Sequence, residues 1–391
     1  VLSLHHRVIP AHLHLREPSP HIAWADLPLR VPTQLVEWEP IGGRRIGGIS
    51  SFGFSGTNAH VVVEEAPAVA VDPDRSEAGR ACLLALSARD EKALAELAAR
   101  YAAALQGRPD TELADICHTA NAGRSHFEQR ATIVARTIEE LRDRLLALSE
   151  GRPREGLRTA RVSRRDPLRI AFLFTGQGAQ YANMARGLYE TEPVFRSALD
   201  RCAQALSAVL PRPLLDVVFP VEGESKLVDE TAYAQPALFA IGHALTELWR
   251  SWGISPNVVM GHSIGEFAAA SVAGVLDLDD ALRLVAERGR LMQSLPPGGA
   301  MAAIFASEAE VTEAIAARTA RVSVAAVNAP GQAVISGAAG DVASVCGSFE
   351  QRGVRCQPLT VSHAFHSPLM EPILERFERE AARARLAPAR L

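Results

Sequence analysis

The sequence predicts an α/β fold with a parallel sheet for its longer C-terminal part, and three observations support this. First, an apolar run at 258–260 leads into G-H-S-I-G and then into an alanine-rich helical segment. Second, residues 168–174 form an apolar run that predicts a buried strand, followed by helical segments to about residue 252. Third, residues 298–361 contain several short predicted strands with helices between them, which predicts a small α/β subdomain inserted into the larger one.

The preceding residues divide into two smaller parts. Residues 1–67 are rich in proline, glycine and histidine, and 45–63 predict a strand, a glycine-rich loop and another strand. Residues 68–166 begin with a linker and continue as a small α+β module with strands near 83–86 and 131–135. Ser87 and Thr137 are expected to cap its two helices, with Asp90 and Glu140 three residues further on. A last helix is predicted from Pro368 to about Arg385.

Composition restricts the class of protein. The 391 residues suggest two or three domains, and a formal net charge of −4, from 41 basic and 45 acidic residues, gives no global field for nucleic acid. The five cysteines are scattered and contain no C-x-x-C, which argues against a disulfide framework or a metal site and fits a reducing, cytoplasmic compartment. The chain has no run of 18 apolar residues, so no membrane segment is expected.

The strand, G-x-S-x-G turn and helix around Ser263 predict a serine nucleophile held on a tight elbow. A nucleophile of this kind needs a base and an oxyanion hole. His366 is the candidate base, and the backbone N–H groups of Ile264 and Gln177 are the candidate oxyanion donors. The loop that contains Gln177 lacks the G-K-[ST] ending of a phosphate-binding loop, which argues against a nucleotide site. Arg288 is the candidate group for gripping a substrate carboxylate.

Several motifs together resemble one family. They are T-G-Q-G-A-Q, G-H-S-I-G, R-G-R-L-M-Q, V-N-A-P-G-Q-A-V-I-S-G and H-A-F-H-S-P. In this arrangement they are similar to the acyltransferase domain of a modular type I polyketide synthase, over residues 168–391. P-S-P-H-I-A-W and F-G-F-S-G-T-N-A-H-V-V-V-E-E-A-P resemble the end of a ketosynthase. The module between them resembles the linker domain that joins the two enzymes.

The resemblance implies three domains. They are a C-terminal ketosynthase remnant with a partial thiolase-like fold at 1–67, a linker domain at 68–166, and an acyltransferase domain at 167–391. The last would have a hydrolase-like core and an inserted ferredoxin-like subdomain at 298–361. Relatives continue through further core elements, so an exposed sheet edge and a less firmly oriented catalytic histidine are expected here. The ketosynthase catalytic cysteine and histidines lie upstream of Val1 in the family, so no condensation activity is expected.

The resemblance also assigns roles at the site. Ser263 carries the acyl group as an ester, His366 is its general base and acid, and the Gln177 and Ile264 backbones stabilise the oxyanion. Arg288 holds the extender carboxylate. The other residues expected at the substrate site are His262, Asn328, His363 and Phe365. H-A-F-H resembles the malonyl-selecting form of its motif, because Phe365 would fill the space that an α-methyl group needs. Ile264 agrees with that choice, since methylmalonyl-selecting relatives often have glutamine there.

The implied reaction moves malonyl from CoA to Ser263 and then to the phosphopantetheine thiol of an acyl carrier protein. The implied partners are that carrier protein and the rest of the synthase with its ketosynthase dimer, and no bound cofactor is expected. Three other interpretations remain open on the sequence. The chain could be a serine esterase or thioesterase, a non-catalytic connector between catalytic domains, or part of a fatty-acid synthase, which differs from the first interpretation mainly in the linker.

Overall fold

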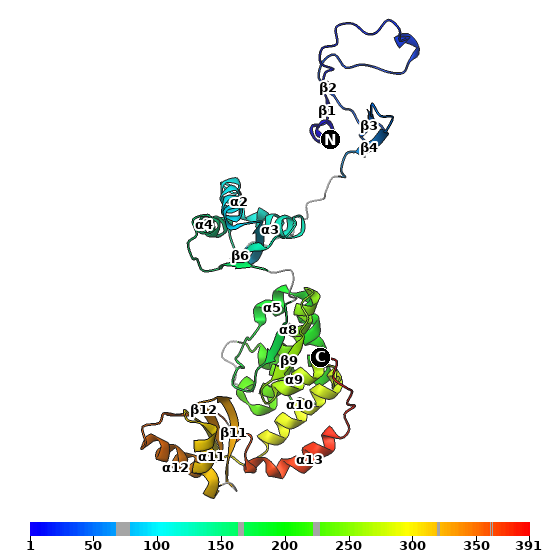
Figure 1. The fold of residues 1–391 in the computed structure, drawn as a ribbon. Helices are drawn as coiled ribbons and strands as arrows, with labels where there is room; N and C mark the ends of the chain where they lie inside the picture. The colour runs from blue at the N-terminus through cyan, green and yellow to red at the C-terminus, as the bar shows by residue number, and fades with distance from the viewer. Residues whose placement is uncertain (68–78, 163–167, 222–226, 319–320, 360, 362) are drawn as a thin grey trace. The chain divides into compact units, whose positions relative to one another are not determined.

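The computed structural model describes residues 1–67, 79–162, 168–221, 227–318, 321–359, 361 and 363–391. The chain divides into two compact units, Val1–Arg164 and Arg165–Leu391 (Figure 1). The predicted borders at 67/68 and 166/167 involve residues outside the described ranges, so the three-part division stays a prediction. No helix in the described ranges is both long and apolar enough to cross a membrane.

The first 67 residues contain two small antiparallel pairs of strands. The β3–β4 hairpin confirms the predicted strand, glycine-rich loop and strand, and most of its side chains are exposed. The elements of this part are α1 (Leu2–His6), β1 (Val8–Ile9), η1 (Trp24–Asp26), β2 (Val36–Glu37), β3 (Ile46–Phe52) and β4 (Asn58–Glu64), with β1 paired to β2.

The rest of the first unit is the α+β module that the sequence predicted. Its antiparallel sheet has the order β5-β6-β7 and packs with three helices around a core that includes Leu84, Ile133 and Leu141. Its elements are β5 (Cys82–Ala88), α2 (Glu91–Ala104), η2 (Asp110–Glu112), α3 (Leu113–Ala122), β6 (Gln129–Ala135), α4 (Ile138–Ser149) and β7 (Leu157–Arg161). The sequence patterns did not predict α3 and β7.

One helix cap in this module was predicted wrongly and the other correctly. Ser87 lies inside β5, where its hydroxyl accepts a hydrogen bond from the Phe127 backbone N–H. Asp90 is the N-cap of α2, and its carboxylate accepts from the Ala93 N–H. The strand continues further than predicted because pairing with β6 extends to Ala88. Thr137 caps α4 as expected, accepting from the Glu140 N–H.

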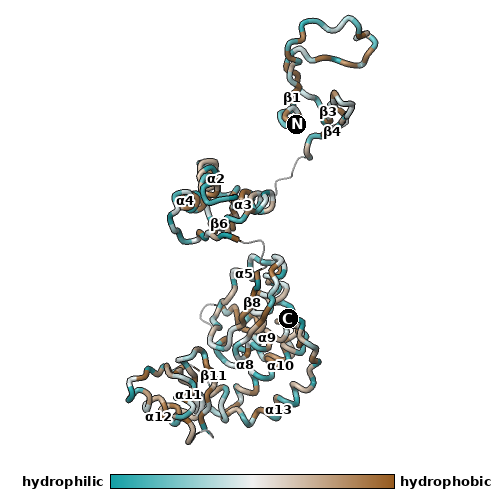
Figure 2. Tube along the Cα trace, viewed as in Figure 1, coloured by the Kyte–Doolittle hydropathy of each residue, from teal (hydrophilic) through white to brown (hydrophobic). Residues whose placement is uncertain are grey.

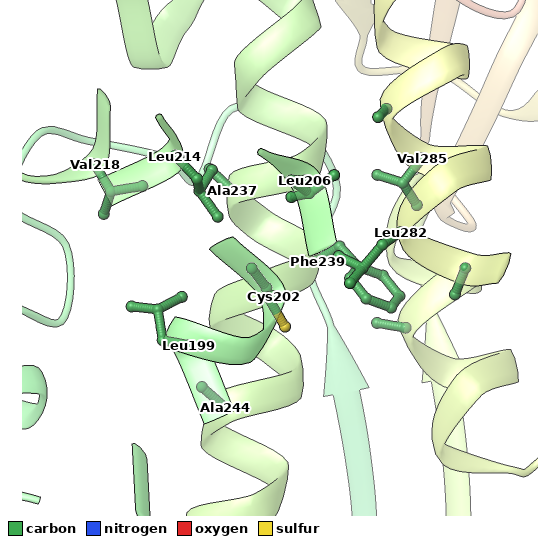
Figure 3. Packing of buried hydrophobic residues seen from close by; sticks show 14 of the residues in the cluster. Leu199, Cys202, Leu206, Leu214, Val218, Ala237, Phe239, Ala244, Leu282 and Val285 are labelled. Atoms are coloured by element: carbon green, nitrogen blue, oxygen red, sulfur yellow. The ribbon is translucent and has the colours of Figure 1, made fainter. Parts of the chain in front are cut away.

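The second unit is built around a parallel strand pair and a layer of helices. Strand β8 pairs with β9 in parallel, from Ala171 opposite Val258 to Phe174 opposite Gly261. Helices α6, α8 and α10 pack together in a core in which Leu199, Phe239 and Leu282 are fully buried (Figure 3). The elements are β8 (Ala171–Phe174), α5 (Arg186–Thr191), α6 (Pro193–Leu206), α7 (Leu214–Val218), η3 (Leu227–Asp229), α8 (Thr231–Ser251), β9 (Val258–Gly261), α9 (Gly265–Val272) and α10 (Leu278–Gln293).

Strand β8 is shorter and less buried than the sequence predicted. The apolar run at 168–174 gave the expectation of a fully buried strand, and Figure 2 shows hydrophobic residues along it. Leu173 is nevertheless 67% exposed, and its register partner Met260 is 61% exposed. Side chains alternate between the two faces of a strand. The helices therefore cover one face of this two-stranded pair and leave these two side chains on the other.

The predicted inserted subdomain is confirmed as ferredoxin-like. Its four strands form an antiparallel sheet in the order β11-β12-β10-β13, with one helix after β10 and one after β12. This β-α-β-β-α-β succession is the ferredoxin-like pattern. The elements are β10 (Gly299–Ile304), α11 (Glu308–Ile315), η4 (Ala316–Arg318), β11 (Val322–Ala329), β12 (Gln332–Ala338), α12 (Ala339–Glu350) and β13 (Cys356–Pro358).

The final helix ends earlier than predicted. It comprises η5 (Pro368–Met370) and α13 (Glu371–Ala381), and α13 lies alongside α10 (Figure 1). In the last residues of the chain, backbone hydrogen bonds go to other elements. The Ala387 N–H donates to the Val275 carbonyl, and the Arg385 N–H donates to Asp280 Oδ2. These tertiary bonds replace the helical ones on which the predicted end at Arg385 depended.

The close contact between α8 and α10 depends on Gly289. A Cβ atom at this position would lie 2.8 Å from the Thr231 carbonyl oxygen and 3.2 Å from Ala232 Cα, both backbone atoms of α8. We expect Gly289→Ala to destabilise the second unit by ~1–3 kcal/mol, because the two helices must separate. Urea unfolding would measure this change.

Gly347→Ala is the matched control, since Gly347 is inside α12 and a Cβ there meets no atom within 4 Å. The control should be neutral or should stabilise the chain by up to ~1 kcal/mol, because alanine has the higher helix propensity. Equal urea midpoints for the two variants would contradict the close-contact argument.

Candidate active site

Strand β9 ends in a strained turn that presents Ser263 at the start of α9. Ser263 has φ +53°, in the left-handed region that costs free energy for a residue with a side chain. The two glycines that flank it, Gly261 and Gly265, have no room for a side chain. A Cβ at Gly261 would lie 2.1 Å from the Glu266 nitrogen, and one at Gly265 would lie 2.3 Å from the Phe174 carbonyl oxygen. The G-x-S-x-G spacing thus allows the turn to pack against β8.

His366 lies within hydrogen-bond distance of this serine, as the sequence predicted. Ser263 Oγ and His366 Nε2 are 2.8 Å apart, and the residues are 103 positions apart in the chain. In the described ranges, Ser263 is the only hydrogen-bond partner of the His366 ring. The His366 backbone also has a left-handed φ of +60°, and its carbonyl accepts a 2.9 Å hydrogen bond from Ser323 Oγ on β11. The inserted subdomain therefore holds the histidine by its backbone.

The surroundings of His366 lower the pKa of its ring. Burial of the ring is the largest cause of the lowered pKa, and electrostatic interactions with Arg288 and His262 act in the same direction. A histidine with a lowered pKa stays neutral, and can accept a proton, at pH values where an ordinary histidine is charged. The His366 ring can therefore accept a proton below the ordinary histidine pKa of ~6.5.

A pH profile would check this inference. We expect the rate of Ser263 labelling by a fluorophosphonate, which requires only the nucleophile and its base, to rise with pH through a midpoint below ~6.5. In Arg288→Met the midpoint should move upward, because one charge that disfavours the protonated ring is gone. A midpoint at or above ~6.5 in the unaltered chain would contradict the inferred direction of the pKa shift.

The two predicted oxyanion donors have no hydrogen-bond partner among the described residues. Hydrogen bonds within the described ranges use neither the Gln177 N–H nor the Ile264 N–H. Ile264 directly precedes α9, whose N-terminal dipole favours negative charge at this point.

The side chains of these two residues have other partners. The Gln177 side chain is fixed separately, since its Nε2 donates to Thr231 Oγ1 at 3.1 Å. The Ile264 side chain is 1% exposed and borders a different, apolar cavity of about 510 Å³ beside β8.

Arg288 brings a positive charge to the same point. Its Nη1 donates to Gln235 Oε1 at 2.7 Å, and its Nη2 donates to Ser263 Oγ at 3.4 Å. In the part of the chain that is described, no carboxylate forms an ion pair with this guanidinium. Burial lowers the Arg288 pKa to about 10, so the group stays charged at neutral pH. A partly buried cation without an anionic partner is a site for an anion.

Four of these residues line one cavity of about 760 Å³ between the main core and the inserted subdomain: Gln177, Ser263, Arg288 and His366. Of the other predicted site residues, His262, Asn328 and Phe365 line the cavity too. His363 lies behind the lining: it is 6% exposed, and its Nε2 is 2.9 Å from the Leu295 carbonyl oxygen. The apolar part of the wall comes from Phe365 and from Met301, Val334, Leu359 and Val361.

The sequence patterns did not indicate that Thr231, Gln235 or Ser323 belongs to the site. Thr231 and Gln235 are four residues apart on α8 and therefore share one face of the helix. Both are buried, at 0% and 1% exposure. Two polar residues at helical spacing in the otherwise apolar T-A-Y-A-Q-P-A-L-F-A were the available signal, because buried polar groups need partners.

Comparisons with known proteins show the family to which this chain belongs. A family model described as acyl transferase domain matches residues 171–391, and one described as CurL-like, PKS C-terminal matches residues 82–145. The chain therefore belongs to the acyl transferase family, and over its whole length it resembles modular type I polyketide synthases.

One curated relative and two solved structures show how far the likeness extends. The spectinabilin polyketide synthase system protein NorB of Streptomyces orinoci is 43% identical over 100% of this chain, which spans 18% of that protein. The acyltransferase domain from module 8 of the salinomycin polyketide synthase is 34% identical, with a TM-score of 0.72 over 80% of this chain and 73% of that one. The acyl transferase domain of SpnD, in complex with 2-(pent-4-yn-1-yl)malonyl, is 34% identical, with a TM-score of 0.68 over 80% and 72%.

Proposed function

We propose that this chain transfers a malonyl group from CoA to Ser263 and then to the phosphopantetheine thiol of an acyl carrier protein. One observation carries the proposal. Ser263 Oγ lies 2.8 Å from His366 Nε2 and 3.4 Å from Arg288 Nη2, so a nucleophile, a base and a cation meet in one cavity. Ester or thioester chemistry requires only the first two groups. The cation favours an acyl group that has a carboxylate of its own.

In the first half-reaction, His366 Nε2 accepts the Ser263 proton as Oγ attacks the thioester carbonyl carbon. The Gln177 and Ile264 N–H groups stabilise the oxygen that becomes negative, and each such donor is worth ~3–4 kcal/mol in comparable sites. The C–S bond then breaks, and the CoA sulfur takes the proton from His366. A malonyl ester remains on Ser263.

The second half-reaction reverses these steps with a different thiol. The phosphopantetheine thiol gives its proton to His366 and attacks the ester carbonyl carbon through the same oxyanion contacts. The C–O bond breaks, Ser263 Oγ recovers the proton, and the malonyl thioester leaves on the carrier protein. Arg288 holds the free carboxylate throughout, which fixes the reacting carbonyl near Oγ.

We propose malonyl rather than methylmalonyl because of the cavity wall. Phe365 lies one residue before the base and is 7% exposed. Its ring packs with Met301 and Val334 in the same hydrophobic cluster. An α-methyl group would have to displace this packed wall. A single methyl group gives discrimination of ~1–3 kcal/mol, which is a preference and not an absolute exclusion.

Phe365→Ser should weaken this preference. We expect the ratio of malonyl to methylmalonyl loading to fall about tenfold or more when both CoA esters compete in one reaction, because the smaller side chain leaves room for the methyl group. Competition removes the effect of any loss of folded protein, since both esters meet the same folded fraction. Phe365→Tyr keeps the bulk and is the control. An unchanged ratio in Phe365→Ser would show that Phe365 does not select the extender.

The proposed partners are the acyl carrier protein and the ketosynthase of the same synthase, with malonyl-CoA as the donor. No bound cofactor is required by the proposed steps. A cytoplasmic location fits the five cysteines, all of which are free thiols.

The proposed function is tested by intact-protein mass after mixing the chain with malonyl-CoA, and then with a phosphopantetheinylated carrier protein. The expected result is a malonyl adduct on Ser263 that disappears as malonyl appears on the carrier protein. Rapid release of free malonate without transfer would favour a thioesterase. A folded chain that forms no adduct would overturn the proposal and favour a connector role.

A further inference from the structure

The Arg288 guanidinium is held by a neutral partner. Its shortest hydrogen bond, at 2.7 Å, goes to the amide oxygen of Gln235, 53 positions earlier in the chain. Its other contacts are Ser263 Oγ and the face of the Phe267 ring, whose centroid lies 6.0 Å from the guanidinium carbon. These partners orient the guanidinium without cancelling its charge. A carboxylate at the same place would form a bidentate ion pair and occupy the anion site from within the protein.

Both the oxygen and the nitrogen of the Gln235 side-chain amide form contacts. A guanidinium has only donors, so the amide oxygen must face Arg288 and the NH₂ group must face away. Nε2 lies 3.3 Å from Met292 Sδ and 3.5 Å from Gln177 Oε1. Gln235 is 1% exposed and also lines the cavity that contains Ser263 and Arg288. One buried side chain therefore links the carboxylate-binding cation to the loop that supplies an oxyanion donor.

We propose that Gln235 is a positioning and specificity-determining residue for acyl loading. Its neutral amide oxygen aims Arg288 toward Ser263 and leaves the positive charge available, so that acyl groups with a free carboxylate are preferred over neutral ones. This inference rests on the proposed function, in which Arg288 binds the extender carboxylate. It adds the reason why the residue beside that arginine is glutamine and not glutamate.

Gln235→Glu tests the inference, because the two side chains have nearly the same size and differ in charge. The unaltered chain and the variant are each mixed with equimolar malonyl-CoA and acetyl-CoA, and the adducts on Ser263 are counted by intact mass. We expect the malonyl-to-acetyl ratio to fall about tenfold or more in the variant, chiefly through loss of malonyl loading, since the new carboxylate competes for the guanidinium. Labelling of Ser263 by a fluorophosphonate should persist, which shows that the nucleophile and base are intact.

Gln204→Glu is the matched control for net charge, since Gln204 is an exposed residue of α6 and does not line the cavity. It should keep the ratio of the unaltered chain. Gln235→Leu removes the acceptor without adding a charge. It should raise the KM for malonyl-CoA about tenfold while the KM for acetyl-CoA stays constant, because Arg288 loses its orientation but keeps its charge.

The outcomes distinguish a failure of the Gln235 inference from a failure of the proposed function. If the unaltered chain prefers malonyl and a folded Gln235→Glu keeps that preference, the role of Gln235 is overturned and the proposed function stands. If Gln235→Glu does not fold, an equal change of both KM values in Gln235→Leu overturns the inference, since a purely structural residue would affect both esters alike. An unaltered chain that loads neither ester, or loads both equally, contradicts the proposed function itself.

Discussion

Replacement of Ser263 by alanine is expected to abolish the acyl adduct completely and to lower transfer to the carrier protein by a factor on the order of 10⁶, as when other serine enzymes lose their nucleophile. The structure gives the reason. Ser263 Oγ is the atom that both His366 and Arg288 reach, at 2.8 and 3.4 Å. The turn should keep its shape, because alanine and serine have a similar cost in the left-handed backbone conformation of this position. Intact mass after mixing with malonyl-CoA measures the adduct.

Ser271→Ala is the matched control for this experiment. Ser271 lies on α9, the helix that Ser263 precedes, but it does not line the cavity. Its adduct should equal that of the unaltered chain. A malonyl adduct that persists in Ser263→Ala would place the nucleophile elsewhere and contradict the proposed mechanism.

The second large effect is expected at Arg288. Arg288→Met should lower malonyl loading about 100-fold, because charge-assisted hydrogen bonds to a carboxylate contribute ~1.5–3 kcal/mol each. Acetyl loading should change little, since the acetyl group has no carboxylate to bind. Competition between malonyl-CoA and acetyl-CoA, read by intact mass, measures both effects in one reaction.

Arg288→Lys gives a check on geometry as well as charge. Lysine keeps the charge but has no planar fork, so it should recover only part of the malonyl preference. Thermal unfolding of both variants is required beside the loading data, because the Arg288→Met change would leave the buried Gln235 amide oxygen without its donor at 2.7 Å. Equal losses of malonyl and acetyl loading would mean that Arg288 supports the fold and not the substrate.

The sequence patterns were most reliable where the information is local. The G-x-S-x-G turn between a strand and a helix follows from residues that are adjacent in the chain, and the structure places Ser263 on it with φ +53°. The alternation of short strands and helices over 298–361 was enough to predict the inserted subdomain, because each element has its own hydrophobic period. The Thr137 cap was also predictable, since its partner is the backbone three residues further on.

The predictions were wrong where long-range contacts decide. Ser87 was expected to cap a helix, but pairing of β5 with β6 keeps it in a strand. Leu173 was expected to be buried, but the alternation of faces in the β8–β9 pair leaves it 67% exposed. The final helix was expected to reach about Arg385, but it ends at Ala381, and hydrogen bonds to other elements hold the residues near the end of the chain.

The sequence by itself determined which residue types and local turns this protein has: the serine on its elbow, the candidate histidine and arginine, and the elements that present them. Only the tertiary structure decided how Ser263 and His366 come within 2.8 Å of each other across 103 positions, and that the buried amide of Gln235 lies 2.7 Å from Arg288. The reason is physical. Local patterns record the hydrogen bonds and periodicity of neighbouring residues, whereas a polar network forms only when packing of α8, α10 and the inserted subdomain brings distant groups together and excludes water from between them.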